Sequence, residues 1–196
     1  MPASERRITR ADILSPQQYA AERTERRRAI REIKRARRIA VGPVATFYFE
    51  SFDTMLQQVL EMLHIEKGGE EQIADELAAY NPLIPNGREL CATLMFEIPD
   101  AVERDRMLRT LTGIESHVFL EIGDARVAAV PENDVERTKE DGKTSSVHFL
   151  HFPISNDQAE ALKGGAMLRL AIVHPNYGHI ALVSEAARAA FVSDLS

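Results

Sequence analysis

The chain has little cysteine and no long apolar run. Cys91 is the single cysteine among 196 residues, which excludes an internal disulfide framework and any zinc or iron–sulfur site made of cysteines alone. No apolar stretch approaches the ~20 residues that a membrane-spanning helix needs, and the polar start of the chain lacks the apolar core of a signal peptide. We therefore expect a cytoplasmic protein that does not enter a membrane.

Two common catalytic signatures are also missing. The chain contains no Gly-x-Ser-x-Gly nucleophile motif. The run Gly142-Lys143-Thr144-Ser145 imitates the end of a phosphate-binding loop, but Arg137 stands where that loop requires its first glycine, and a β-rich run follows it. Cys91 falls in an apolar, strand-like run, which indicates a small core residue rather than a nucleophile. Nucleotide binding and nucleophilic catalysis are therefore disfavoured.

Positive charge is concentrated at the start of the chain. Residues 1–40 hold 12 lysines and arginines against 5 acidic residues, although the whole chain has a net charge of −6. Ser15, Pro16 and Gln18 predict a capped helix that runs to about Arg38. The sequence therefore predicts a long basic helical arm, residues 1–43, ahead of an acidic remainder.

This basic arm has several partners to consider. It could dock an acidic protein, a nucleic acid, the acidic remainder of its own chain, or a second subunit. Nucleic acid is the least favoured, because Tyr19 is the only stacking aromatic in the arm and no known binding motif is present. The residues expected to make the docking contact are Arg27, Arg31, Lys34, Arg35 and Arg38.

The remaining residues, 44–196, predict a single domain of the α+β class. A largely antiparallel sheet of about five to six strands is expected to pack against helices. Two prolines and an Asn-Gly pair within residues 80–87 separate a helical front, 44–87, from a sheet-rich back, 88–196. Gly123-Asp124 predicts a hairpin turn. Strands are expected over 44–50, 89–98, 116–122, 125–130, 144–152 and 166–174, and helices over 52–66, 70–79, 100–113, 155–163 and from 184.

Five of the six histidines fall into three short clusters. These are Glu61-x-x-His64, His148-x-x-His151 and the turn from His174 to His179. Neutral imidazole is the commonest protein metal ligand and the side chain that titrates nearest to neutral pH. The clustering therefore predicts a site that binds a metal or handles protons.

The three clusters differ in strength. Glu61 and His64 share one helix face, as in di-iron carboxylate bundles, but the motif occurs once in a strand-rich chain and is equally typical of a solvated surface pair. His148 and His151 are three apart in a strand and point to opposite faces, so only one can join a given site. The Pro-Asn-Tyr-Gly turn can bring His174 and His179 together, which makes them the strongest ligand pair, although a purely structural turn is the alternative.

Five segments taken together resemble one bacterial family. They are Arg37–Pro43 continuing to Thr46–Glu50, Glu61–Glu66, Ala79–Gly87, Gly142–Val147 and His174–Tyr177. The family is catalogued as domain of unknown function 3501, and the resemblance spans nearly the whole chain. Its genes often lie beside those for rubrerythrin-like proteins and iron–sulfur oxidoreductases, so the resemblance implies these partners and an iron, peroxide or electron-transfer role. It also implies that Glu50, Glu61, Glu66, Glu97, His174 and His179 belong to the family pattern.

The leading hypothesis is therefore a cytosolic metal-binding protein in a rubrerythrin-linked oxidative-stress or redox system. Iron is the expected metal, with manganese or zinc as alternatives that coordination geometry would decide. His174 and His179 would supply two ligands, and one or two of the glutamates Glu50, Glu61, Glu66 and Glu97 would supply the rest. If coordination positions stay open, the protein would be a metal-dependent oxidoreductase. The alternatives are a metal-free module that docks an acidic redox partner through the basic arm, and a nucleic-acid-binding protein.

Overall fold

The computed structural model describes residues 6–132 and 142–196. Within these ranges lie six α-helices, three short 3₁₀ segments and nine strands. The helices are α1 (Pro16–Arg37), α2 (Phe52–Glu66), α3 (Gly69–Tyr80), α4 (Ala101–Thr110), α5 (Asn156–Lys163) and α6 (Glu185–Val192). The strands are β1 (Arg38–Val41), β2 (Ala45–Phe49), β3 (Glu89–Phe96), β4 (Val118–Ile122), β5 (Ala125–Ala128), β6 (Val130–Pro131), β7 (Val147–Pro153), β8 (Leu168–His174) and β9 (Tyr177–Leu182).

The strands form two antiparallel sheets. One sheet has five strands in the order β1-β2-β3-β7-β6, and the other has four in the order β5-β4-β8-β9. Their inner faces supply a common core, which includes Phe47, Leu94 and Leu150 from the first sheet and Leu120 and Leu170 from the second. The α+β class and the antiparallel pairing are therefore confirmed, with the strands arranged as a sandwich.

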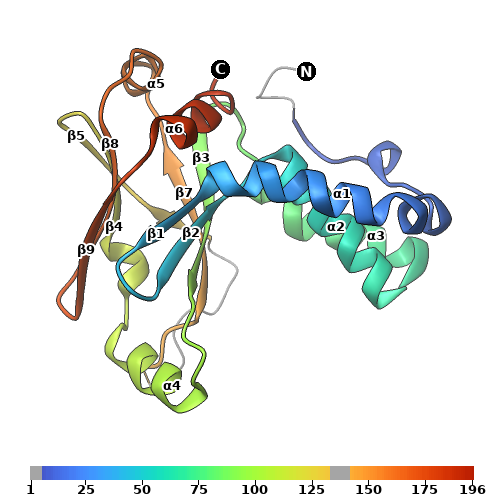
Figure 1. Ribbon diagram of the computed structural model, residues 1–196, viewed down its shortest axis with the longest axis horizontal. Helices are drawn as coiled ribbons and strands as arrows, with labels where there is room; N and C mark the ends of the chain where they lie inside the picture. Colours follow the sequence, from blue (N-terminus) through green and yellow to red (C-terminus); the bar gives the residue numbers. More distant parts are fainter. Residues whose placement is uncertain (1–5, 133–141) are drawn as a thin grey trace.

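Helices α1, α2 and α3 form a lobe beside the sandwich, and Figure 1 shows the two parts at opposite ends of the molecule. The lobe has its own apolar cluster, which is built around Tyr19, Val59, Leu60 and Ile73. Ser15 caps α1 and accepts a hydrogen bond from the Gln18 amide, as the sequence predicted. Each part of the molecule therefore has a separate core, and α1 runs from one to the other.

A buried ion pair holds the end of α1 against α6. The Arg37 guanidinium donates to both carboxylate oxygens of Asp194, over 2.6 Å and 3.0 Å, and to the carbonyl oxygens of Glu50 and Ala190. A charge of this kind is stable in a protein interior only when it is paired and its donors are satisfied. This Arg37–Asp194 clamp therefore fixes where the helical lobe leaves the sandwich.

Three strands were not predicted from the sequence. Residues 38–41 continue directly from α1 as β1, and residues 130–131 form the short β6. The segment after the histidine turn is β9, whose apolar residues Ile180 and Leu182 face solvent, so it lacks the buried apolar alternation of an ordinary strand. Arg137, which counted against a phosphate-binding loop, lies outside the described residues. No helix within the described ranges is both long and apolar enough to cross a bilayer.

Candidate metal centre

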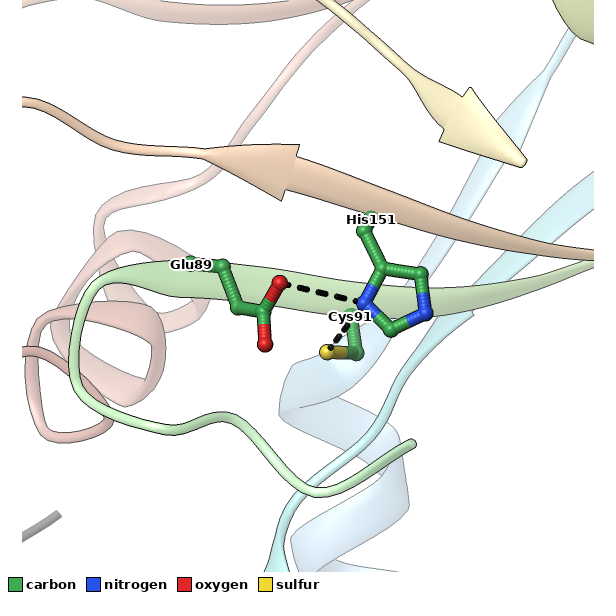
Figure 2. Close-up of side chains that lie close together, drawn as sticks. All are labelled: Glu89, Cys91 and His151. Carbon is green, nitrogen blue, oxygen red and sulfur yellow. Dashed lines mark hydrogen bonds and ion pairs between the residues drawn. The ribbon is translucent and has the colours of Figure 1, made fainter. Parts of the chain in front are cut away.

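A compact group of donor atoms lies on the outer face of the five-stranded sheet. Cys91 of β3 and His151 of β7 are direct cross-strand partners. Glu89 lies two residues before Cys91 and therefore projects from the same face, because side chains alternate along a strand. Leu90 and Leu94 point the other way, into the core. Strand register thus brings three chemically different donors together, as Figure 2 shows.

The donor atoms of the three side chains lie close enough together to bind one metal ion. His151 Nδ1 lies 3.1 Å from Glu89 Oε2 and 3.4 Å from Cys91 Sγ. In the part of the chain that the structure describes, this is the only group of three or more histidine, cysteine or acidic residues with donor atoms within 4.8 Å of one another. Cys91 is buried, whereas Glu89 and His151 are only partly so. The cluster is therefore compact and keeps a route to solvent.

A fourth residue, Glu132, lies on the other side of the imidazole. Glu132 Oε1 lies 3.5 Å from His151 Nε2. Metal-bound histidines in proteins commonly direct their second ring nitrogen towards a carboxylate, which fixes the ring orientation and the tautomer. With Nδ1 facing Glu89 and Cys91, and Nε2 facing Glu132, His151 has the surroundings of a ligand that binds through Nδ1.

The local electrostatics favour a cation. The hydrogen bond to Glu89 raises the pKa of His151, against the opposing effect of burial, and the charges of Glu89 and Glu132 add to the increase. Burial is the main cause that raises the pKa of the Cys91 thiol far above its ordinary value, and nearby carboxylates raise it further. The thiol is therefore no free nucleophile at neutral pH. A bound cation would stabilise the thiolate in the same place.

The distances between the donor atoms also fit a bound metal ion. Bonds of about 2.0–2.3 Å in a tetrahedral site place neighbouring donor atoms about 3.3–3.7 Å apart. The separations of 3.1 Å and 3.4 Å around His151 Nδ1 are close to this range. One sulfur, one nitrogen and one oxygen donor suit zinc or ferrous iron better than magnesium or calcium.

The two histidines of β7 lie on opposite faces, as predicted for residues three apart in a strand. His148 faces the core, where its Nε2 lies 2.9 Å from the Ser145 carbonyl oxygen. His151 faces outward and joins the cluster. Of the eight residues predicted as ligands, His151 is the one found in this group.

His174 and His179 have different neighbours. The Asn176 amide donates to His174 Nδ1, so that Nε2 carries the proton and faces the Thr112 carbonyl oxygen at 3.3 Å. The His179 ring lies edge-on to Tyr177. Within the described ranges, neither imidazole forms an ion pair with a carboxylate. His174 Nδ1 is thus used within the β8–β9 turn, and Nε2 holds the turn against the segment after α4.

The four predicted glutamates occupy four separate places. Glu61 accepts hydrogen bonds from Arg23 and Tyr19, and these lower its pKa to about 2. Glu50 is buried, which raises its pKa, and it accepts from two threonines. Glu97 accepts from Tyr48, Thr46 and Arg38, while the exposed Glu66 accepts from Gln72. Each carboxylate therefore already has protein donors of its own.

Some of the basic side chains predicted for docking form ion pairs within the chain. Arg27 lies 4.0 Å from Glu61, Arg35 pairs with Glu32, and Arg38 pairs with Glu97. Arg31 and Lys34 form no ion pair with any residue that the structure describes. The arm thus lies partly against acidic groups of its own chain, which was one of the predicted alternatives.

Comparison with known proteins gives a fold and a family without an activity. The family model described as "Protein of unknown function (DUF3501)" matches residues 7–195. A crystal structure of a protein of unknown function from Burkholderia pseudomallei K96243 is 36% identical, with a TM-score of 0.91 over 97% of this chain and 100% of that chain. A search of the curated proteins finds no match. The similarity therefore extends over both the lobe and the sandwich.

Proposed function

Because the chain belongs to the DUF3501 family, whose function is unknown, membership supplies no activity, and we propose from the site alone that the protein binds a divalent transition metal. Glu89, Cys91 and His151 would be the ligands, with Glu132 orienting the imidazole. Zinc and ferrous iron are the proposed ions, since both accept sulfur, nitrogen and oxygen donors together. The rubrerythrin-linked redox role stays a prediction that rests on the family resemblance.

The observation that carries this proposal is the convergence of two acceptors on one imidazole nitrogen. His151 Nδ1 lies within 3.4 Å of both the Glu89 carboxylate and the Cys91 sulfur. A single proton on Nδ1 points to one acceptor at a time, whereas a metal ion bonds to all three donors together. A metal ion therefore accounts for all three donors at once, whereas the proton on Nδ1 accounts for one contact.

Three protein ligands leave one position of a tetrahedral ion open. Catalytic zinc sites have this arrangement, whereas structural sites close the shell with a fourth protein ligand. When bound, the metal would supply Lewis acidity to a molecule in that position. Glu89 and His151 are each partly exposed, so such a molecule could reach the ion from solvent.

The test is metal content by elemental mass spectrometry on protein purified without oxygen or chelators and then reconstituted. We expect close to one equivalent of iron or zinc in the wild type and a loss of it in Cys91→Ser and His151→Ala. The double variant His174→Ala/His179→Ala is the matched control and should keep its metal. The proposal is wrong if reconstituted wild type holds no metal, or if both site variants retain it.

A second readout separates loss of a ligand from loss of folding. Cobalt(II) bound by a thiolate has a sulfur-to-metal charge-transfer absorption in the near ultraviolet. Cys91→Ser replaces one atom and should leave the circular dichroism spectrum unchanged while removing this band. A folded Cys91→Ser variant that keeps the band would show that another group binds the metal.

A second candidate function is docking of an acidic partner through α1. Arg31 and Arg28 are exposed and, within the described residues, neither forms an ion pair. Reversing both charges with Arg28→Glu and Arg31→Glu should abolish retention of an acidic redox protein. Added salt should weaken the wild-type interaction, because exposed charges are screened beyond ~10 Å at 0.1 M salt. Association that neither salt nor these variants weaken would rule out this function.

A further inference from the structure

The helical lobe contains a cavity far from the proposed metal ligands. Its volume is about 570 Å³, within the ~300–1,000 Å³ that small-molecule sites occupy. It lies between the segment that precedes α1 and the facing sides of α2 and α3. Leu14, Leu60, Leu63 and Ile73 are among its lining residues, so most of the wall is apolar. The cavity can therefore hold an apolar body of ligand size.

Charged groups occur at the edge of this cavity, and among the described residues one of them has no counter-charge. Arg10 forms an ion pair with Glu70, which neutralises both. Lys67 also lines the cavity, and within the part of the chain that is described it makes no ion pair and no side-chain hydrogen bond. His64 lies beside it, with its ring edge-on to Tyr19 at 5.6 Å between centroids. The cavity thus combines an apolar wall with one uncompensated ammonium group.

Lys67 also has an unusual backbone conformation for a residue with a side chain. Lys67 ends α2 with φ of 55°, and it is the only non-glycine residue with positive φ in the described ranges. Glycine is the usual residue in this left-handed position, because a Cβ adds steric strain there. Two glycines follow directly, at positions 68 and 69. The chain therefore has a lysine where the backbone geometry would favour glycine.

We propose that this cavity binds an aliphatic carboxylate, with its chain among the leucines and its carboxylate at Lys67. Lys67 is exposed, so an apolar body without a charge would leave its ammonium to water alone, and a small anion without a chain would leave the apolar wall exposed to water. A single negative group matches Lys67, the one cation of the cavity lining that forms no ion pair within the described residues. This site is independent of the metal cluster, which lies on the sandwich.

The experiment compares decanoate with decanol by isothermal titration calorimetry on the full-length protein. We expect saturable binding of decanoate, and binding of decanol weaker by about two- to fivefold, the size of one exposed ion pair. Lys67→Gly should weaken decanoate by the same factor and leave decanol unchanged. Leu63→Trp, which fills the cavity, should abolish both.

Lys67→Gly is expected to stay folded, so a loss of binding in this variant would not result from unfolding. Glycine suits the left-handed backbone, so this variant should melt at the wild-type temperature or above it. Lys163→Ala removes a lysine from α5, outside the lobe, and should bind decanoate like the wild type. The proposal is overturned if no saturable binding occurs, if decanol binds as tightly as decanoate, or if Lys67→Gly or Leu63→Trp binds decanoate like the wild type.

Discussion

Removing one charge of the Arg37–Asp194 clamp should destabilise the protein more than any loss of a surface ion pair. The side chains of Arg37 and Asp194 are only 7% and 3% exposed. In Asp194→Asn, one amide oxygen replaces two charged acceptors, and the buried guanidinium keeps its charge beside a competing donor. Breaking a buried pair in this way costs about 3–5 kcal/mol. That is a large share of the ~5–15 kcal/mol by which a typical domain is stable.

Urea unfolding followed by circular dichroism measures this free energy directly. Glu160→Gln is the control, because it removes an exposed pair with Lys163 and should cost less than about 1 kcal/mol. A double variant, Arg37→Met/Asp194→Leu, removes both charges and should recover most of the loss, since no buried charge remains unpaired. A loss below about 1 kcal/mol in Asp194→Asn would refute the reasoning.

Three further predictions concern pH and close packing. The lowered pKa of Glu61 contributes stability that is present above its ordinary pKa of 4.5 and is lost as the pH falls towards about 2. Glu61→Gln should therefore remove roughly 1–2 kcal/mol of this acid-dependent stability, measured by urea titrations at pH 2–6. Identical pH profiles of variant and wild type would contradict this. Gly42 has a φ of +73°, and in Gly42→Ala the new Cβ would lie 2.6 Å from the His179 ring. Thermal melts should therefore show a loss of about 2–4 kcal/mol in the free energy of unfolding. The control Gly113→Ala, whose Cβ has no neighbour within 4 Å, should lose about 1 kcal/mol. Because the pKa values of Cys91 and His151 are raised, protons should compete with a metal ion for these side chains. Chelator competition at pH 6–8 should show a metal affinity that rises about tenfold to a hundredfold per pH unit. A flat profile would exclude these ligands.

Local signals in the sequence predicted the helices well. The serine at the start of α1, of α2 and of α5 caps its helix with a residue three positions later, and such pairs are visible in the sequence itself. The strand β9 was missed because its apolar residues, Ile180 and Leu182, point to solvent rather than to the core. Prediction was therefore reliable where structure depends on neighbours in the chain.

The candidate site depends on contacts that no local pattern records. The period of a strand correctly separated His148 from His151, but it could not show which residue lies opposite His151. That partner is Cys91, 60 residues away, and the β3–β7 register alone brings them together. Glu61 is a similar case, since its pairing with Arg23 arises from the packing of α1 on α2. Of the proposed ligands, His151 is therefore predictable from the sequence, whereas Glu89 and Cys91 depend on tertiary pairing.

The clamp between α1 and α6 also sets an order of events during synthesis. Arg37 and Asp194 are 157 residues apart, and at roughly 5–20 residues per second a ribosome needs about 8–30 s to pass from one to the other. The buried cluster of the helical lobe uses residues 8–84 and can pack early. The sandwich closes only after β9 and α6 have emerged. On the ribosome, the cavity-bearing lobe would therefore exist for seconds before the strands that carry the proposed metal ligands have paired.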